Sequence, residues 1–510
     1  MVTRHLLLFA CLLSLPFSTA RASTYLVTNT NASGANSLQA AIDSVNTHAG
    51  PDSIHFNIPG PAPHTIVVSC ADPCVLNDDD IVLDGYTQPG SAPNTAHVGD
   101  PFNGTIAVEI ASSSYCTQYP ALTINGARNI VRGILIHNYH FAYNIVVNGD
   151  DAVIDGCDIE AAGVVGIDVR PSSGVQIGGT TPASRNLIFD DYYGILVEGE
   201  NGNPVLNLSI QGNYIGPRYT QGPATIGVLV FGYTTGVMIG GHLTAPCTMN
   251  GAMNMIHDQQ GAGIALTGDE VTGVSILSNI IYSNGGLGID LGGDGVTPND
   301  PGDGDTGPNQ LQNFPRIMSS QENSISGVLQ STPNRTFTIQ VFDNHSSACD
   351  PSGYGEGKLI YGETQAVTDQ LGYANFTVSC DSVVAGHYYT ATATDDEGNT
   401  SEFSECFEST VTAASDHPAV FALHANVPNP FNPATIIPFE MGAAGRVDIV
   451  IFDIAGRRVR TLVSEYHEAG PGTARWDGRD DHGKPVASGV YFCRMNAGTF
   501  SASRKIVLLK

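Results

Sequence analysis

Four carboxylates stand close together in the stretch 286–315, GLGIDLGGDGVTPNDPGDGDTGPNQLQNFP, and they raise the question of metal binding. The four residues are Asp294, Asp300, Asp303 and Asp305. Hard oxygen donors crowded into a glycine-rich loop suit Ca²⁺, although the spacing is not that of an EF-hand and no glutamate closes the loop. A loop that only caps the preceding strands would have the same composition. Calcium binding and plain capping are therefore the two hypotheses for this loop.

Two pairs of adjacent aspartates are the candidates for catalysis, because glycoside hydrolysis uses two carboxyl groups that flank the bond to be cut. They are Asp150 with Asp151 in NGDDAV, and Asp190 with Asp191 in FDDYYG. The NGDD stretch is similar to the Asp-Asp motif of polygalacturonase-type glycosidases, but the companion Asn-Thr-Asp, Gly-His-Gly and Arg-Ile-Lys motifs are absent. Solvated turns are the simpler interpretation of both pairs. Tyr192 and Tyr193, which follow the second pair, are candidates for stacking on a sugar ring.

The charge balance disfavours two classes of function. The formal net charge is −28, and residues 23–315 contain 27 Asp and Glu, five Arg and no Lys. A uronate lyase needs a basic residue to remove a proton and cations to hold the substrate carboxylate. An anionic surface also repels phosphate backbones, so a nucleic-acid partner is not expected. Four histidines of the solenoid show no metal-binding spacing of the His-x-x-x-His kind; they are His137, His140, His242 and His257.

The N-terminus predicts export. Arg4 and His5 precede the apolar run LLLFACLLSLPF, and an A-x-A pattern ends at Ala22. This pattern is typical of a secretory signal peptide over residues 1–22. No later run approaches the roughly 20 apolar residues of a membrane helix. We therefore expect a mature chain without a transmembrane segment, located outside the cell or on its surface.

Export also permits disulfides. Nine cysteines follow the signal peptide, so at least one of them cannot form an intramolecular pair. The closest two are Cys70 and Cys74 in CADPC, and we predict a local disulfide between them. Two of the three cysteines in a later segment are also expected to be able to pair; these three are Cys349, Cys380 and Cys406.

A short repeat runs through residues 121–291, where glycine is followed by alternating apolar residues. It recurs at gaps of 33, 28, 33, 36 and 25 residues, starting from Gly133, Gly166, Gly194, Gly227, Gly263 and Gly288. Short strands at this spacing without a helical period predict a β-solenoid, in which each rung buries its apolar face on the next. A sandwich or propeller is the alternative, but a propeller blade needs four strands, and most gaps leave room for two or three. Segment 36–47 predicts a helix that caps the N-terminal end.

The opening of the chain resembles a known family. TNTNASGANSLQAAIDSVNTHAGPDSIHFNIPG, IVLDGYTQPG at 81–90 and the aspartate-rich stretch at 286–315 are similar to bacterial secreted right-handed parallel β-helix proteins with the pectate-lyase-like (pectin lyase) fold. Gln39 stands where that family often has arginine. The resemblance implies a right-handed parallel β-helix over residues 23–315, with the predicted helix as its cap.

Two further modules are expected after the β-helix. Residues 316–411 alternate with period two and resemble an Ig-like β-sandwich, and a spacer follows at 412–420. Residues 421–510 contain VPNPFNPATIIPF, GRVDIVIFDIAGRRVRTL and ARWDGRDDHGKPVASGVYFCRM. These motifs resemble the C-terminal sorting domain (type A) of type IX secretion substrates, an Ig-like fold akin to one in flagellar hook-capping proteins. The resemblance implies the type IX secretion machinery as a partner.

Two hypotheses for function follow from these observations. The first is a non-enzymatic, exported structural or binding protein, adhesin-like or carbohydrate-binding, because the sequence lacks a complete catalytic motif. The second is a polysaccharide hydrolase or lyase that uses the groove of the β-helix, and it depends on fold analogy alone. A polysaccharide or cell-surface glycan is the candidate ligand in both.

Overall fold

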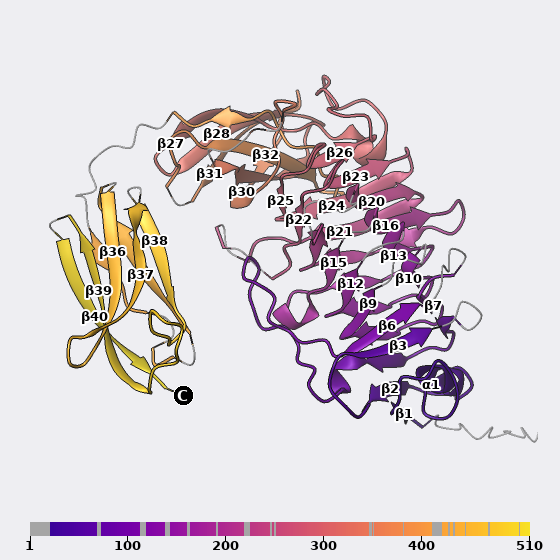
Figure 1. The fold of residues 1–510 in the computed structure, drawn as a ribbon. Coiled ribbons are helices and arrows are strands. Elements are labelled where there is room, and N and C mark those ends of the chain that lie inside the picture. The colour runs from indigo at the N-terminus through magenta and orange to yellow at the C-terminus, as the bar shows by residue number, and fades with distance from the viewer. Residues whose placement is uncertain are drawn as a thin grey trace, which may run out of the picture. The chain divides into compact units, whose positions relative to one another are not determined.

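Three parallel sheets form a β-helix in the first part of the chain, as the computed structural model shows (Figure 1). We call these sheets A, B and C, and their strands are given below. From β2 onward, each turn of the chain passes through sheet A, then sheet B, then sheet C. Sheets B and C contain eight strands each, and sheet A contains ten. The predicted all-β fold class and the predicted parallel solenoid are therefore confirmed.

The structure describes residues 21–509 apart from 69–72, 113–118, 138–142, 161–163, 190–191, 219–224, 245–246, 249–250, 346–348, 350, 381, 411–420, 427–428, 432–433, 444, 468–469 and 499.

The strands of the β-helix are mostly three to seven residues long. Sheet A consists of β1 (Ser23–Val27), β2 (Asp52–Phe56), β5 (Ile81–Asp84), β8 (Ile130–Arg132), β11 (Val153–Asp155), β14 (Gln176–Gly178), β17 (Val205–Leu206), β18 (Ser209–Gln211), β21 (Thr234–Gly240) and β24 (Val271–Leu277). Sheet B consists of β3 (His64–Val68), β6 (Val108–Ser112), β9 (Ile134–His137), β12 (Asp158–Glu160), β15 (Leu187–Phe189), β19 (Tyr214–Gly216), β22 (Met255–His257) and β25 (Ile280–Tyr282). Sheet C consists of β4 (Cys74–Leu76), β7 (Leu122–Ile124), β10 (Tyr143–Val147), β13 (Val165–Val169), β16 (Tyr193–Gly199), β20 (Ile226–Gly232), β23 (Ile264–Thr267) and β26 (Ile289–Leu291).

Aliphatic side chains stack in register through the interior. In sheet B one isoleucine of each strand lies directly over the next, and all of them are buried; the column is Ile66, Ile110, Ile136, Ile159, Ile188, Ile215, Ile256 and Ile281. β-Branched side chains have few rotamers and pack well on a pleated surface, so a repeated isoleucine fills the same space in each turn. This stacking explains the repeat that is seen in the sequence.

A ladder of buried asparagines marks the corner between sheets A and B. The amide nitrogen of Asn186 donates to Asn213 Oδ1 at 2.9 Å, Asn213 donates to Asn254 at 3.0 Å, and Asn254 donates to Asn279 at 2.9 Å. Each of these side chains also accepts a hydrogen bond from, or donates one to, the backbone of a neighbouring turn, as Asn186 does with Cys157 N and Ile154 O. A buried corner has polar backbone groups that need partners, and the amide side chain supplies both a donor and an acceptor.

The predicted N-terminal helix is α1 (Leu38–Val45). The hydroxyl of Ser37 accepts from Ala40 N at 3.2 Å, so Ser37 is the N-cap. One face of α1 is apolar and joins the core of the β-helix; it carries Leu38, Ala41, Ile42 and Val45. Three short 3₁₀ helices occur at Gly85–Thr87, Pro182–Ser184 and Pro308–Leu311. Among the described residues, no helix is long and apolar enough to cross a membrane.

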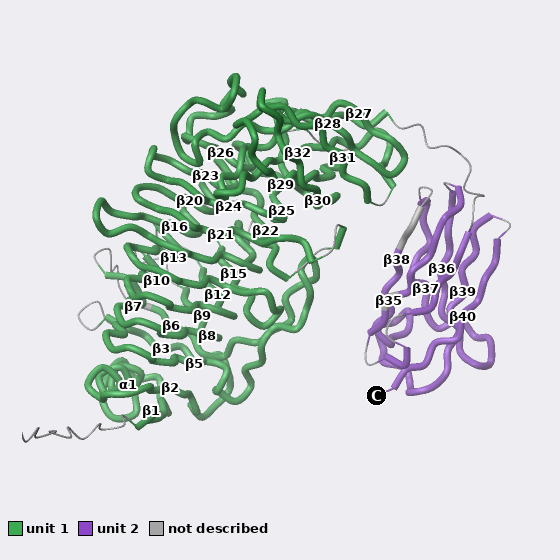
Figure 2. The backbone as a smooth tube through the Cα atoms, turned by 180° about the vertical axis from the view of Figure 1, so that it is seen from behind, with its two compact units in different colours: residues 1–412 green, residues 413–510 purple. Residues whose placement is uncertain are grey.

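Antiparallel strands begin at Arg316 and form a first sandwich of two sheets. Its three-stranded sheet contains β27 (Arg316–Gln321), β28 (Ser324–Gln330) and β31 (Tyr373–Ser379). Its four-stranded sheet contains β30 (Leu359–Val367), β29 (Thr336–Asp343), β32 (Tyr388–Asp395) and β33 (Phe407–Glu408). This first sandwich belongs to the same compact unit as the β-helix, residues 1–412 (Figure 2).

Side chains of the first sandwich bind the backbone of the last turn of the β-helix. Glu402 accepts from Leu291 N at 3.0 Å and from Thr297 N at 2.9 Å. Four more backbone N–H groups are bound in the same way, with Gln340 accepting from Ser278 at 2.8 Å, Thr400 from Ile276 at 2.8 Å, Asn399 from Gly273 at 2.7 Å and Glu356 from Asn284 at 3.0 Å. The edge of the terminal turn is therefore paired and not left open.

The second sandwich, in residues 413–510, is a compact unit of its own. Its three-stranded sheet contains β34 (Ala422–Leu423), β35 (Thr435–Met441) and β38 (Gly470–Trp476), and its four-stranded sheet contains β37 (Arg458–His467), β36 (Gly445–Asp453), β39 (Gly489–Ala497) and β40 (Phe500–Leu508). Trp476, the only tryptophan of the chain, is fully buried in its core and donates through Nε1 to Arg479 O at 2.9 Å.

Candidate functional sites

The aspartate-rich loop brings three of its four carboxylates together. One oxygen from each of Asp300, Asp303 and Asp305 lies within 4.8 Å of the others. Asp303 is fixed from two sides, because it accepts from Asn313 N at 2.9 Å and from Ser331 Oγ at 2.5 Å. These two hydrogen bonds hold the Asp303 carboxylate in place in spite of the repulsion from its neighbours.

The charge of this cluster is not fully compensated. Asp305 Oδ1 is shielded from solvent and has no hydrogen-bond partner. Burial raises the pKa of Asp303, and burial together with the charge of Asp300 raises the pKa of Asp305. Such carboxylates gain either a proton or a cation. Clustered carboxylate oxygens are the donors that suit Ca²⁺, so the residues present fit this ion.

Asp294 lies outside that cluster. It lines a separate pocket of about 330 Å³, which also contains Asp269, Thr297 and Leu311. The spacing in the sequence could not show that Asp294 lies in this pocket and outside the cluster, because a glycine-rich loop can adopt many conformations.

Of the predicted catalytic aspartates, the structure describes Asp150 and Asp151. Asp150 and Asp151 are exposed turn residues between sheets C and A, and Asp151 has a left-handed backbone with φ 53°. Asp150 Oδ1 accepts from Ser173 N at 2.8 Å, and Asp151 N donates to Ser173 O at 2.7 Å. These contacts join one turn of the β-helix to the next. Asp190 and Asp191 lie outside the described residues.

Tyr192 and Tyr193 lie at the corner between sheets B and C. Their rings pack edge to face with centroids 4.8 Å apart, and 43% of Tyr192 is exposed. Tyr193 N donates to Val164 O in the preceding turn, and Val164 is 47% exposed. We call Val164, Tyr192 and Tyr193 the corner patch.

Charged groups that the sequence analysis did not single out line the sheets on both sides of this corner. On sheet B, Arg218 binds Asp158 at 2.8 and 2.9 Å, contacts Glu160 and lies 4.8 Å from the centre of the Phe189 ring. Burial raises the pKa of Asp158, although the charge of Arg218 opposes that effect. The signal for this group was the alternation within AVIDGCDIE, which points Asp158 and Glu160 to the outer face.

A second charged group lies on sheet C. Arg170 Nε donates to Asp168 at 2.9 Å and lies 3.9 Å from Glu198. Burial raises the pKa of both carboxyl groups. The side chain of Asp168 is only 1% exposed, which leaves no room for a substrate beside it. Asp168 therefore positions Arg170.

Every arginine of the β-helix is engaged within the chain. Four are paired with carboxylates, namely Arg128, Arg132, Arg170 and Arg218. The fifth, Arg185, is buried, donates to Ala96 O and His97 O at 3.1 and 3.2 Å, and stacks on Tyr214. Each of these five cations thus has a partner within the chain.

The predicted Cys70–Cys74 disulfide is wrong. Cys74 is a free thiol at the start of β4, and its side chain is buried in the core of the β-helix. Burial raises its pKa to about 12, which makes it unreactive. Cys70 lies outside the described residues. Proximity in sequence was a poor guide here, because the inward position of Cys74 on β4 places its sulfur in the core.

Two other disulfides are present among the described residues. Cys349 pairs with Cys406 within the first sandwich, which is one of the predicted possibilities. Cys380 pairs with Cys247, 133 residues earlier. This second disulfide joins the first sandwich to a loop of the β-helix.

Comparisons with known proteins identify one domain. Residues 433–500 match the family model of the FlgD Ig-like domain. A comparison with curated proteins found no match. The predicted likeness of the second sandwich to an Ig-like domain of flagellar hook-capping type is thus confirmed, and its role in sorting stays a prediction.

Several solved structures are similar to parts of the chain at low scores. Latent PorU from Porphyromonas gingivalis is 14% identical with a TM-score of 0.16, covering 39% of this chain and 19% of its own. PorZ, described as an essential surface component of the type IX secretion system of the same organism, is 18% identical with a TM-score of 0.14, covering 24% of this chain and 15% of its own. ORF18 of Geobacillus virus E2 is 11% identical with a TM-score of 0.30 and covers 86% of both chains. Likenesses at these scores carry no argument about function.

Proposed function

We propose that this chain is an exported glycan-binding protein, which uses the outer surface of the β-helix to hold a neutral polysaccharide. The observation that carries the proposal is the corner patch with its neighbouring charged groups. Exposed Tyr192 offers a ring for stacking on a sugar, and the Phe189–Arg218 stack lies at the end of the preceding strand. Aromatic faces with fixed polar groups beside them are a usual composition of sugar-binding surfaces.

The preference for a neutral glycan follows from charge. The arginines that could hold a uronate are paired with carboxylates of the β-helix or buried. The surface therefore offers groups that can form hydrogen bonds with a sugar. None of the five arginines of the β-helix is a free cation. A polysaccharide that carries no carboxylates meets no net repulsion from the acidic β-helix.

Export is supported by the two ends of the chain. The apolar N-terminal run has the form of a signal peptide, and the second sandwich matches an Ig-like domain family. We propose that the second sandwich directs the chain to the cell surface through type IX secretion, as its sequence motifs imply.

A binding assay tests the glycan proposal. Purified mature protein should be retained by at least one neutral polysaccharide, such as a glucan, mannan or xylan, and not by polygalacturonate. The Tyr192→Ala/Tyr193→Ala variant should lose at least tenfold in affinity, since each aromatic stacking contact contributes about 1 kcal/mol or more. Tyr373→Ala, which removes a 51% exposed tyrosine of the first sandwich, is the matched control.

The same assay separates binding from catalysis. Retention without release of reducing sugars is the expected result. Turnover of the bound polysaccharide that disappears in Asp158→Asn or Glu160→Gln would replace the binding proposal by the alternative of a polysaccharide-degrading enzyme. Equal retention of the wild type and the double tyrosine variant would remove the corner patch as the binding surface.

We also propose that Asp300, Asp303 and Asp305 bind Ca²⁺. The support is the convergence of the three carboxylates and the shielded, unpartnered oxygen of Asp305. The ion would neutralise a cluster that lies where the β-helix passes into the first sandwich, because Asp303 is bonded to Ser331 of that sandwich. Calcium would therefore act on stability and not on chemistry.

A further inference from the structure

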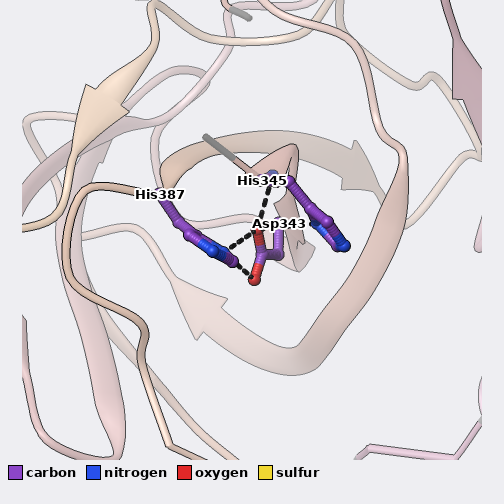
Figure 3. A group of neighbouring side chains, drawn as sticks. All are labelled: Asp343, His345 and His387. Carbon is purple, nitrogen blue, oxygen red and sulfur yellow. Dashed lines mark hydrogen bonds and ion pairs between the residues drawn. The ribbon is translucent and has the colours of Figure 1, made fainter. Parts of the chain in front are cut away.

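Two histidines and an aspartate converge in the first sandwich, away from the surfaces described above. Asp343 ends β29, His345 lies in the following turn, and His387 directly precedes β32. Figure 3 shows the Asp343 carboxylate between the two imidazole rings. One donor atom of each residue lies within 4.8 Å of the others. The sequence gives little sign of this group, because His387 comes from a segment 44 residues after Asp343.

The turn after β29 brings His345 back toward Asp343. In an extended strand the side chains of residues i and i+2 lie about 7 Å apart. Here His345 has a left-handed backbone with φ 59°, and its N–H donates to Asp343 Oδ1 at 2.7 Å. As a result, Nδ1 of His345 lies 3.5 Å from Asp343 Oδ1.

The hydrogen-bonding groups of this cluster are only partly satisfied. Nδ1 of His387 lies 2.9 and 3.0 Å from the two oxygens of Asp343, and the Tyr389 hydroxyl donates to Oδ2 at 3.3 Å. Nδ1 of His345 is shielded from solvent and has no hydrogen-bond partner. The two imidazoles stack with centroids 5.1 Å apart, and both rings lie beside the Asp343 carboxylate. A single divalent ion would satisfy both nitrogens and the carboxylate at once.

We propose that Asp343, His345 and His387 form a binding site for a divalent metal ion of the zinc class. Zinc lies about 2.0–2.2 Å from nitrogen and oxygen ligands in tetrahedral sites, which places the ligand atoms roughly 3.3 Å apart. The N···O separations of 2.9 Å for His387 and 3.5 Å for His345 bracket that value. The two nitrogens therefore lie at distances from the carboxylate that are close to those of a tetrahedral site.

The donor chemistry distinguishes this site from the aspartate cluster. Two imidazole nitrogens select zinc, nickel or copper, whereas a site of carboxylates alone suits calcium. The His345 side chain is 42% exposed, so an ion can reach the site from solvent and a water molecule can complete its coordination. The bound ion would join the end of β29 to the segment before β32.

Metal titration of the untagged, full-length mature protein tests the site. Zn²⁺ is titrated in competition with a chromophoric chelator, and Co²⁺ is used as a spectroscopic substitute. We expect one strong site per chain that a large excess of Ca²⁺ does not compete for. His345→Ala and His387→Ala should each weaken zinc binding at least tenfold. His97→Ala removes an exposed histidine of the β-helix and should leave binding unchanged.

Each result of this titration decides whether Asp343, His345 and His387 bind zinc. No zinc binding by the wild type, or equal binding by both histidine variants, overturns the proposal, and so does full competition by Ca²⁺. Thermal melting in chelator verifies that each variant folds. If His387→Ala fails to fold because it also loses its hydrogen bonds to Asp343, His345→Ala decides, since the Nδ1 atom that it removes has no hydrogen-bond partner.

Discussion

The two sandwiches have the same arrangement of strands and opposite relations to the rest of the chain. Each pairs a three-stranded with a four-stranded antiparallel sheet. The first belongs to one compact unit with the β-helix, whereas the second is a unit of its own. The first also has buried polar side chains that face the β-helix, among them Gln340, Thr400 and Glu402. A similar scaffold is therefore used in one case as an end cap and in the other as a separate module.

Edge pairing explains the difference. A β-helix ends in strands whose N–H and C=O groups lack the next turn, and such edges are unstable or aggregate unless they are covered. Six backbone N–H groups of residues 273–297 donate to side chains of the first sandwich. Backbone pairing adds Ile281 with Gly357, at 2.8 and 3.0 Å. A sandwich becomes part of a β-helix when its polar side chains replace the missing turn.

The largest expected effect comes from removing each sandwich in turn. A chain that ends at Ala414 keeps the capped β-helix and should melt as the corresponding transition of the full-length protein does. A chain that ends at Pro315 loses the six acceptors and exposes the terminal strands and the apolar core beneath them to solvent. Folded proteins are stable by only about 5–15 kcal/mol, so this shorter chain should not remain folded and soluble. Circular dichroism and size-exclusion chromatography measure both outcomes.

The cellular location of the truncated chain tests the role of the second sandwich. If the second sandwich directs sorting, the chain that ends at Ala414 should be folded and retained in the periplasm, while the full-length chain reaches the surface. Surface delivery of the truncated chain would refute the sorting assignment without affecting the end-cap argument. A soluble, folded chain ending at Pro315 would refute the end cap and leave sorting untouched.

The disulfide between Cys247 and Cys380 gives the next largest effect. Its closed loop of 133 residues is long, and the chain-entropy model assigns such a loop about 5 kcal/mol. Replacing both cysteines by serine should lower the free energy of unfolding of the first unit by about 2–5 kcal/mol, measured by urea denaturation. The matched control is Cys349→Ser/Cys406→Ser, whose loop of 57 residues lies within the first sandwich. Only the first double variant should make the junction between β-helix and sandwich sensitive to protease.

The sequence predicted the periodic parts of this fold well. Stacked isoleucines and recurring glycines are local signals, because each turn repeats the same packing problem. One detail differs: the repeat at Gly133 precedes β9 of sheet B, whereas the later repeats, from Gly166 on, precede or begin strands of sheet C. A glycine followed by aliphatic residues identifies an inward-facing strand, but it does not say which side of the coil that strand occupies.

The sequence could not predict contacts between distant segments. The Cys247–Cys380 disulfide, the Asp343–His387 pair and the Glu402 contacts join residues 44 to 133 positions apart. The disulfide and the Glu402 contacts form because the sandwich is docked on the last turn, whereas Asp343 and His387 meet because β29 and β32 are neighbours in one sheet of the sandwich; no spacing within a motif encodes either arrangement. The aspartate loop is an intermediate case, since three of its residues are close in sequence and in space, while Asp294 is close in sequence only.

The pH dependence of the cap gives a smaller and more specific effect. Burial raises the pKa of Glu402 from 4.5 to about 7, and the charge of Asp290 adds to that shift. Because the folded-state value is above the unfolded one, the stabilising contribution is complete below pH 4.5 and is lost as the pH rises through about 7. The loss amounts to on the order of 3 kcal/mol.

Substitution of Glu402 isolates this contribution. Urea denaturation should show that wild-type stability falls between pH 5 and pH 8, a range that brackets the Glu402 pKa of about 7. Glu402→Gln should be less stable than wild type at the lower pH, because its amide nitrogen cannot accept from Thr297 N. Its stability should change less with pH, so the two proteins converge at the higher pH. Glu408→Gln, an exposed position, should follow the wild type throughout.

Calcium is expected to give the smallest effect and to act at the same junction. An ion that binds only the folded loop stabilises it by RT ln(1 + [L]/Kd), and extracellular sites have dissociation constants of roughly 10⁻⁴–10⁻³ M. At about 10 mM calcium the gain is then about 1.4–2.7 kcal/mol, which raises the melting temperature of the first unit by a few degrees at most. Asp303→Asn/Asp305→Asn should abolish the rise, whereas Asp294→Asn, outside the cluster, should retain it. Equal melting of the wild type in calcium and in chelator would leave a plain capping loop. A rise that persists in the double variant would place the ion elsewhere, and Asp79 and Asp80 would be poor substitutes, because Arg128 already binds them at 3.2 and 2.6 Å.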